Sequence, residues 1–240
     1  MLCAGHGTRL GELTREVPKP ALPIGDDALI GHTLRQLGAQ GFTDVAINLH
    51  FKPEVIEAHV GDGSRYGVRV RYAYEPALLG TAGAVRNLAD FLGRDEDFVV
   101  LYGDLLLDED LGRMVARHRE RGAAATLLLH QRHGSNSLVQ MDDDQRITGF
   151  IERPDAEARA RHPFPWVNSG AQVLHRRMIA LIPEVGPSDL PRDVFGPAIG
   201  RERIEGYPLT GYRCAIDSPA RYDEARAGYA DGRYRAARRP

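Results

Sequence analysis

The sequence has few of the features that mark membrane, secreted or disulfide-stabilised proteins. Its 240 residues include two cysteines, Cys3 and Cys214, which cannot build a disulfide framework, and neither lies in a metal-ligand spacing such as C-x2-C. No stretch approaches the roughly 20 apolar residues that a membrane helix needs. The first residues show no basic region followed by an apolar one, as a signal peptide would. We therefore expect a cytoplasmic protein with no membrane partner.

An excess of charge of one sign is also missing. The 31 basic and 33 acidic residues give a formal net charge of −2, which argues against nucleic acid as the main partner. Lysine itself is scarce, because Lys19 and Lys52 are the only lysines among the basic residues. A lysine kept in such an arginine-rich composition favours a specific role. The length predicts one large domain, with two small domains as the alternative, and a chain of this size can bury about 70% of its unfolded surface.

Apolar runs alternate along the chain with segments of helical period. The runs at residues 45–49, 68–72, 98–102 and 125–129 predict strands. Helical spacing occurs at residues 29–37, 54–60, 83–92 and 111–121. This alternation predicts an α/β fold with a mainly parallel sheet, in which residues 98–102 are buried on both faces. Residues 139–141 and 147–150 are expected to form an antiparallel hairpin that turns at residues 142–144.

Two N-terminal segments carry residue types that suit phosphate binding. Glycines in Gly5-His6-Gly7-Thr8-Arg9 let backbone amides approach an anion, and Arg9 offers a charged fork that matches phosphate oxygens. The segment is neither a P-loop nor the dinucleotide fingerprint, and a plain tight turn is the alternative interpretation. Lys19 lies between Pro18 and Pro20, whose stiff backbone can aim a lysine, although an exposed loop lysine is the commoner outcome.

Two aspartates follow apolar runs. Asp104 comes after the predicted strand at 98–102, at the edge of the sheet where ligands bind, and carboxylates there commonly hold Mg²⁺ against phosphates. A turn aspartate is the alternative. Asp217 repeats the pattern after Ile216, but Asp217 or Ser218 could equally cap a helix running from 219 to 229. The two aspartates could converge on one metal ion.

Together these segments resemble the sugar-1-phosphate nucleotidyltransferase family, in family order and over nearly the whole chain. The matching segments are Gly5–Leu10, Pro18-Lys19-Pro20, Glu75-Pro76, Leu79–Gly83, Gly103-Asp104, Glu152-Arg153-Pro154, Asn168-Ser169-Gly170 and Asp217-Ser218-Pro219. The resemblance implies a Rossmann-like nucleotidyltransferase fold in a single domain, 1–240, with a mixed, mainly parallel sheet flanked by helices and no C-terminal β-helix. It also implies a mainly nucleotide-binding core at 1–135, a mainly sugar-phosphate-binding part at 136–215, and a C-terminal helix and tail at 216–240.

The same resemblance implies the reaction of an NTP with a sugar 1-phosphate to give an NDP-sugar and pyrophosphate, with Mg²⁺. The implied catalytic residues are Arg9, Lys19 and Asp104. The implied nucleotide-binding residues are Ala4, Gly5, Gly7, Thr8, Arg9, Lys19, Gly80, Thr81, Gly83, Gly103 and Asp104. The implied sugar-phosphate-binding residues are Glu152, Arg153, Asn168 and Gly170. The implied metal ligands are Asp104 and Asp217.

The sequence departs from the family at two positions, and it leaves the substrates open. Arg153 stands where the family usually has lysine, and Ser218 where it usually has glycine. Leu79–Ala84 is similar to the mannose-1-phosphate guanylyltransferases, which favours GTP with a mannose- or heptose-type 1-phosphate. A UTP- or CTP-dependent relative acting on N-acetylmuramate 1-phosphate, a cyclitol phosphate or phosphocholine remains an alternative, as does a non-catalytic sugar-nucleotide-binding regulator. Homodimer formation is also left open.

The glycine loop lies unusually close to the start of the sequence. Members of the family have a longer first central strand before this loop, whereas here only Met1-Leu2-Cys3 precede it. Either that strand is very short or the natural start lies upstream of Met1. A short central strand is expected to reduce stability, because its neighbours lose ladder hydrogen bonds and apolar cover.

Overall fold

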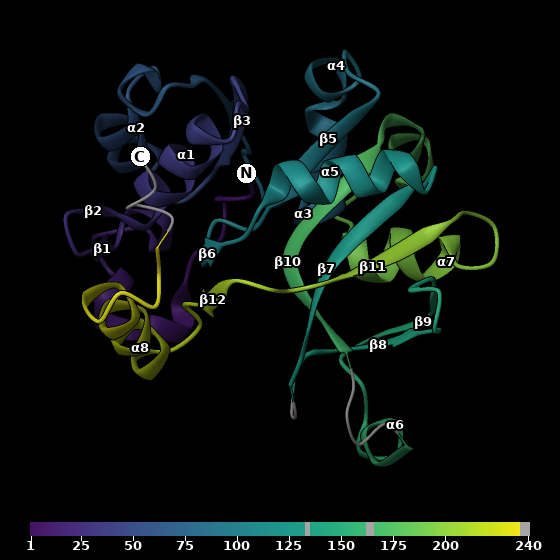
Figure 1. Cartoon of the computed structure of the whole chain (residues 1–240). Helices are drawn as coiled ribbons and strands as arrows, with labels where there is room; N and C mark the ends of the chain where they lie inside the picture. The colour runs from purple at the N-terminus through teal and green to yellow at the C-terminus, as the bar shows by residue number, and fades with distance from the viewer. Residues whose placement is uncertain (133–134, 162–165, 236–240) are drawn as a thin grey trace. The chain divides into compact units, whose positions relative to one another are not determined.

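The computed structural model describes residues 1–132, 135–161 and 166–235, which form two compact units (Figure 1). The first unit comprises Met1–Leu78, Leu101–Asp110 and Thr210–Pro240, and the second comprises Leu79–Val100 and Leu111–Leu209. Across the described ranges, no helix combines the length and the apolar character required to cross a membrane.

The first unit contains three small groups of strands with helices beside them. Its strands are β1 (Pro23–Ile24), β2 (Asp27–Ala28), β3 (Asp44–Leu49), β4 (Arg69–Tyr74), β6 (Leu105–Asp108) and β12 (Tyr212–Ala215). Its helices are α1 (Leu29–Ala39), α2 (Pro53–Val60), α8 (Pro219–Ala230) and the 3-10 helices η1 (Thr8–Thr14), η2 (Lys19–Ala21) and η3 (Ser64–Tyr66). β3 and β4 are parallel, whereas the β6–β12 and β1–β2 pairs are antiparallel.

The segment Met1-Leu2-Cys3 occupies a central position in the first unit. Leu2 forms parallel bridges to Asn48 on one side and Tyr102 on the other. Its N–H donates to the carbonyl oxygen of Leu101 at 2.8 Å, and its own carbonyl accepts from the N–H of Gly103 at 2.9 Å. The three residues therefore join β3 to residues 101–103, directly before β6.

The core of the first unit forms where α8 meets the β6–β12 pair and α1. The buried residues of this cluster are Leu10, Leu22, Ile24, Leu29, Leu106, Cys214, Ile216, Tyr222, Ala225 and Tyr234. α8 begins as the sequence predicts, because the Ser218 side chain accepts a hydrogen bond from the Arg221 N–H at 3.3 Å and Pro219 occupies the first turn. The interpretation of Ser218 as a helix cap is thus confirmed.

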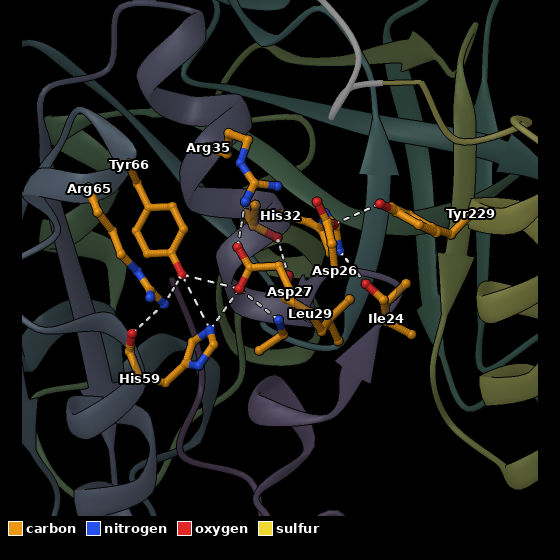
Figure 2. Close-up of polar contacts among 12 residues, drawn as sticks. Ile24, Asp26, Asp27, Leu29, His32, Arg35, His59, Arg65, Tyr66 and Tyr229 are labelled. Carbon is orange, nitrogen blue, oxygen red and sulfur yellow. Dashed lines mark hydrogen bonds and ion pairs between the residues drawn. The ribbon is translucent and has the colours of Figure 1, made fainter.

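A network of charged and polar side chains surrounds Asp27, whose side chain is 7% exposed (Figure 2). Its carboxylate accepts from Arg35 at 2.7 Å, from His59 at 2.8 Å and from the Tyr66 hydroxyl at 3.3 Å, and the Ala28 N–H donates to it at 2.7 Å. The network ties β2 to α1, α2 and η3. The sequence patterns did not single it out, because its members are scattered through two helices and a turn.

The second unit is built on a six-stranded sheet. Its strands are β5 (Asp97–Leu101), β7 (Ala125–Gln131), β8 (Ser137–Met141), β9 (Ile147–Glu152), β10 (Trp166–His175) and β11 (Ile204–Pro208). They lie in the order β11-β7-β10-β8-β9, with β5 also paired to β10. Its helices are α3 (Gly80–Asn87), α4 (Ala89–Leu92), α5 (Leu111–Glu120), α6 (Ala156–Arg161), α7 (Gly196–Ala198), the 3-10 helix η4 (Arg176–Leu181) and the π-helix η5 (Leu190–Phe195). α5 covers β7 and β10 (Figure 1).

The prediction of a mainly parallel sheet is wrong. In the second unit only the β11–β7 pair among those with a described register is parallel, while β7–β10, β8–β10 and β8–β9 are antiparallel. An apolar run indicates burial on both faces of a sheet but not the direction of the neighbouring strand. β7 is apolar from 125 to 129 except at Thr126, yet its neighbour β10 comes from far along the chain and runs in the opposite direction.

Most predicted elements are present close to their expected bounds. The hairpin is confirmed, with Met141 opposite Ile147 and the Asp142 N–H donating to the Arg146 carbonyl at 3.0 Å. The segment predicted as one helix at 83–92 is divided into α3 and α4 at Leu88. Burial of residues 98–102 on both faces holds for Val100 and Leu101 only, because the start of β5 is half-exposed.

Candidate functional site

The glycine loop of the first unit is closed by a residue outside it. Gly7 has a φ of 68° and directly precedes η1, and its carbonyl accepts from the Thr14 hydroxyl and the Leu10 N–H, each at 3.0 Å. A Cβ on Gly7 would lie 3.2 Å from the Thr14 side chain. Gly7 therefore meets two demands that favour glycine, a left-handed backbone and a close neighbour.

Arg9 projects from this loop as an exposed and unpaired cation. Ala4 is buried beneath the loop, whereas Gly5, Thr8 and Arg9 are exposed. Among the residues that the structure describes, the Arg9 guanidinium has no hydrogen-bond or ion-pair partner. Its five donors are thus available to an anion from solution. A Cβ on Gly5 would meet nothing within 4 Å, so the space above this residue is open.

Lys19 is buried, unlike the common exposed loop lysine. It begins η2 between two buried prolines, is 8% exposed, and its Nζ lies 3.3 Å from Oδ2 of Asp104. The two residues are 85 positions apart in the sequence. Asp104 keeps 29% of its side chain exposed, so a ligand can reach this carboxylate while Lys19 is fixed behind it.

Asp104 and Asp217 come from the same end of the β6–β12 ladder. Leu105 pairs with Ala215, and one step beyond it the Ile216 N–H donates to the Asp104 carbonyl at 2.8 Å. Asp217 is the next residue, so the two carboxylates extend from adjacent backbones. No cluster of three or more His, Cys, Asp or Glu side chains able to hold a metal occurs within the described part of the chain. Two carboxylates fit Mg²⁺, which usually keeps several waters and binds one or two carboxylates plus substrate phosphates.

Gly103 allows the chain before Asp104 to approach the first strand closely. A Cβ there would lie 2.5 Å from the Cys3 sulfur and 2.8 Å from the Leu2 carbonyl oxygen. Burial raises the pKa of the Cys3 thiol to about 12, so this sulfur is a packing atom and not a thiolate. The packing demand explains why glycine stands at 103, and its predicted contact with nucleotide stays a prediction.

The segment Gly80–Gly83 forms the start of α3 in the second unit. Gly80 has a φ of 74°, and a Cβ there would lie 2.4 Å from the Ser188 carbonyl oxygen. Thr81 donates from both its N–H and its hydroxyl to Asp189 Oδ1, at 3.2 and 3.3 Å. The Gly83 N–H donates to Ser188 at 3.2 Å. The amides of Thr81, Ala82 and Gly83 are therefore occupied by residues 188–189, and the predicted contact of this segment with a nucleotide stays a prediction.

Ser137 brings two of the predicted sugar-phosphate residues together in the second unit. It lies opposite Glu152 in the β8–β9 pair, and its hydroxyl accepts from the Asn168 N–H at 3.1 Å. The Asn168 side chain accepts from the Gly170 N–H at 3.0 Å, within an irregular stretch of β10 where Gly170 has a φ of 84°. Burial raises the pKa of the Glu152 carboxyl, opposed by the charge of Arg153.

Arg153 has an unusual backbone for its residue type. Its φ is 52°, in the left-handed region, and its N–H donates to the Asn136 carbonyl at 2.7 Å. This conformation, at the end of β9, turns the chain sharply directly after Glu152. The structure thus keeps Glu152, Arg153, Asn168 and Gly170 in one unit, and the loop around Arg9, Lys19, Gly103, Asp104 and Asp217 in the other.

Three residues around these groups were missed in the sequence. Thr14, Ser137 and Asp189 each hold a predicted residue by hydrogen bonds. None lies in a motif, and each contacts its partner through the fold. Of the three, only Thr14 could have been predicted from the sequence, because it follows Gly7 closely enough for a local hydrogen bond.

The sequence matches a known family over most of its length. The profile of the family described as Nucleotidyl transferase matches residues 1–198. The chain is 33% identical over 224 residues to a mannose-1-phosphate guanylyltransferase of Mycobacterium tuberculosis, covering 91% of this chain and 60% of that protein. It is also 33% identical over 209 residues to a UTP–glucose-1-phosphate uridylyltransferase of Synechocystis, covering 81% and 53%. The chain therefore spans somewhat more than half the length of these curated relatives.

Solved structures share the fold at lower identity. HddC from Yersinia pseudotuberculosis, in a crystal structure with GMP-PN, has a TM-score of 0.78 at 20% identity, with 95% of this chain and 97% of that chain covered. At 20% identity the structural similarity supports a shared fold and nothing more. It agrees with the mixed α/β architecture described above.

Proposed function

Because the chain belongs to the nucleotidyl transferase family, we propose that it transfers a nucleotidyl group from an NTP to a sugar 1-phosphate and releases pyrophosphate. In this reaction a phosphate oxygen of the sugar 1-phosphate attacks the α-phosphorus of the NTP, and the bond between the α- and β-phosphates breaks. The observation that carries the proposal is the arrangement of Lys19, Asp104 and Asp217 at one end of the β6–β12 ladder.

The residues of the first unit suit a reaction that needs charge neutralisation more than proton transfer. The sugar phosphate is already a nucleophile, so positioning and electrostatic stabilisation are the main requirements. Arg9, exposed and unpaired, would bind the β- and γ-phosphates and stabilise the departing pyrophosphate. Lys19 would reduce the negative charge around the α-phosphate from its fixed position beside Asp104. Asp104 and Asp217 would hold Mg²⁺, which when bound withdraws charge from the attacked phosphate.

The residues of the second unit would select and hold the sugar phosphate. Glu152 and Asn168, linked through Ser137, would bind sugar hydroxyls. Arg153 would bind the phosphate in place of the usual lysine, and its planar fork can contact two oxygens at once. Gly170 allows the irregular backbone that presents Asn168.

We favour GTP as the nucleotide and a mannose- or heptose-type 1-phosphate as the acceptor. The Mycobacterium relative supports this choice by its guanylyltransferase activity, together with the stretch Leu79–Ala84. The Synechocystis relative, equally similar, supports UTP as the alternative. The presence of Arg9, Lys19, Asp104 and Asp217 together argues against a silent regulator. Cytoplasmic location and homodimer formation stay predictions.

A grid of nucleoside triphosphates against sugar 1-phosphates, with Mg²⁺ present and pyrophosphate release as the readout, tests the proposal. We expect the fastest release with GTP and mannose 1-phosphate or a heptose 1-phosphate. Release with UTP alone would refute the choice of guanine but not the reaction. No release in any combination would refute the reaction itself.

The two lysines of the chain offer a matched pair of variants for this assay. Lys19→Ala removes the buried cation beside Asp104 and should lower kcat about a hundredfold or more, as expected for a group that stabilises the transition state. Lys52→Ala removes a lysine paired with the exposed Glu16 and should leave kcat close to that of the unmodified protein. Equal losses in both variants would mean that Lys19 has no special place in the reaction.

A further inference from the structure

Residues Ser188, Asp189 and Leu190 lie against the start of α3 in the second unit. The Thr81 N–H and hydroxyl donate to Asp189 Oδ1 at 3.2 and 3.3 Å, and the Leu190 N–H donates to the Thr81 hydroxyl oxygen at 2.8 Å. We call this set of contacts the Thr81–Asp189 clasp. Each of the two side chains takes part in two hydrogen bonds, so neither can turn away without breaking both.

Backbone hydrogen bonds next to the clasp also join the two segments. The Ala82 N–H donates to the Ser188 carbonyl at 2.8 Å, and the Ser188 N–H donates to the Leu79 carbonyl at 2.9 Å. The Ser188 carbonyl also fills the space where a side chain at Gly80 would lie. A displacement of residues 188–190 therefore displaces the start of α3, which carries the predicted nucleotide-binding residues.

Residues 188–190 are also connected to β9, which ends at the predicted sugar-phosphate-binding residue Glu152. The connection is η5, which begins directly after Asp189. β9 packs against η5, and the rings of Phe150 and Phe195 lie 6.3 Å apart across this contact. Glu152 ends β9. Asp189 Oδ2 is 3.7 Å from the Arg192 guanidinium, and the Asp189 side chain is 45% exposed, so its charge is not fully neutralised within the structure.

We propose that Asp189 is a positioning residue that couples the nucleotide-side segment Gly80–Gly83 to the sugar-phosphate-side carboxylate of Glu152. Through Oδ1 it fixes Thr81, and it directly precedes η5, which packs against the strand that Glu152 ends. This inference rests on the proposed function, because it assigns one segment to each of the two substrates. It makes the affinity for the sugar phosphate depend on contacts made at the start of α3.

The charges around Glu152 give the coupling a measurable signature. Burial raises the pKa of the Glu152 carboxyl, the charge of Arg153 lowers it, the charge of Asp189 raises it and that of Arg192 lowers it. Arg192 is itself paired with Asp193 at 2.8 Å. Removal of the Asp189 charge should therefore lower the pKa of Glu152. The acid limb of kcat/KM for the sugar phosphate should then move to lower pH.

Three variants separate the hydrogen bonds from the charge, with KM for each substrate and kcat/KM measured across pH. Asp189→Ala removes the hydrogen bonds and the charge together. KM for the NTP and KM for the sugar phosphate should each rise about tenfold, the usual effect of losing a hydrogen bond to a charged group. Asp189→Asn keeps an acceptor for Thr81 and removes the charge, so the acid limb should move while KM for the NTP changes little. Thr81→Val keeps the charge and the backbone N–H bond to Asp189 but removes both hydrogen bonds of the hydroxyl, so both KM values should rise while the acid limb stays in place.

Two results would overturn the coupling. One is an unchanged KM for the sugar phosphate in both Asp189→Ala and Thr81→Val, and the other is an unmoved acid limb in Asp189→Asn. Glu152→Gln should abolish the limb, which checks that it reports Glu152, and thermal melting of Asp189→Asn checks that the fold is kept. An active unmodified protein whose variants fail these tests refutes the coupling alone, whereas an unmodified protein that releases no pyrophosphate refutes the proposed function.

Discussion

Asp27 and Asp104 both carry a carboxylate in the first unit, but their surroundings differ. Four groups donate to Asp27, whose side chain is only 7% exposed. Asp104 has Lys19 at 3.3 Å and keeps 29% of its side chain exposed. The carboxylate of Asp27 has hydrogen-bond donors within the protein for its oxygens. The carboxylate of Asp104 is partly exposed and can bind a further ligand. The first arrangement suits stability and the second suits binding.

The backbone around each aspartate follows the same division. Helix α1 packs directly against Asp27, because a Cβ on Gly31 would come within 2.3 Å of the carboxylate. Asp104 lies at the open end of a ladder, one residue before β6 begins, with Asp217 beside it. A change at Asp27 should therefore act on folding, and a change at Asp104 on turnover.

The strongest test of this contrast is Asp104→Asn. The amide keeps the shape of the side chain but loses the charge that would hold Mg²⁺ and balance Lys19. We expect kcat for pyrophosphate release to fall about a thousandfold, as for the loss of a major electrostatic contact in a transition state. The amide oxygen can still accept a hydrogen bond from Lys19, so the loss of stability should be smaller than in Asp27→Ala. Turnover equal to that of the unmodified protein would show that the metal assignment is wrong.

Asp27→Ala should give the opposite result. The substitution leaves Arg35, His59 and Tyr66 without their shared acceptor. Because Arg35 and His59 are 38% and 31% exposed, water can replace part of what they lose, and we expect a cost of about 2 kcal/mol, as for hydrogen bonds to a charged group. Urea denaturation should show this loss in the free energy of unfolding. At temperatures where the variant is folded, its kcat should match that of the unmodified protein. A large fall in kcat with unchanged stability would contradict the contrast.

The pH dependence of stability gives a third test. Burial raises the pKa of the Asp27 carboxyl, but the Ala28 N–H, His59 and Arg35 together lower it by more, so the net pKa lies below its ordinary value. A lowered pKa contributes stability that is present above the unfolded value, about 3.9, and is lost as the pH falls through the folded value. Between pH 5 and pH 2 the unmodified protein should lose more free energy of unfolding than Asp27→Asn does. Parallel curves would refute the assignment.

The smallest effects are expected at two glycines of the loop before η1. Gly7→Ala places a side chain at a φ of 68° and 3.2 Å from Thr14, and should cost about 1–2 kcal/mol of stability. Gly5→Ala meets open space and should leave stability unchanged, while its methyl group raises KM for the NTP. An unaffected KM in Gly5→Ala would remove Gly5 from the nucleotide site.

The strands and helices were largely predictable because local patterns encode them. Residues 45–49 and 125–129 are apolar enough to be read as buried strands, and the hairpin at 139–150 carries its own turn. Strand direction was not predictable, because the partner of β7 is decided by the path of the chain through α6 to β10. No local pattern records that path.

The candidate site shows the same limit. Lys19 and Asp104 were found because each lies in a motif, but their contact across 85 positions comes from the fold. Asp189 and Ser137 act through hydrogen bonds to single backbone or hydroxyl groups, which any polar residue near the right place could make. Such contacts depend on tertiary structure, and the sequence carries no periodic or motif signal for them.

The two buried thiols have a practical consequence for labelling. Burial raises the pKa of Cys3 to about 12 and also raises that of Cys214, so neither sulfur should react readily with maleimide at neutral pH. Val185 is 89% exposed in the second unit. Val185→Cys should therefore accept a fluorophore at one position without prior removal of the native cysteines, and would make the second unit visible to single-molecule measurements.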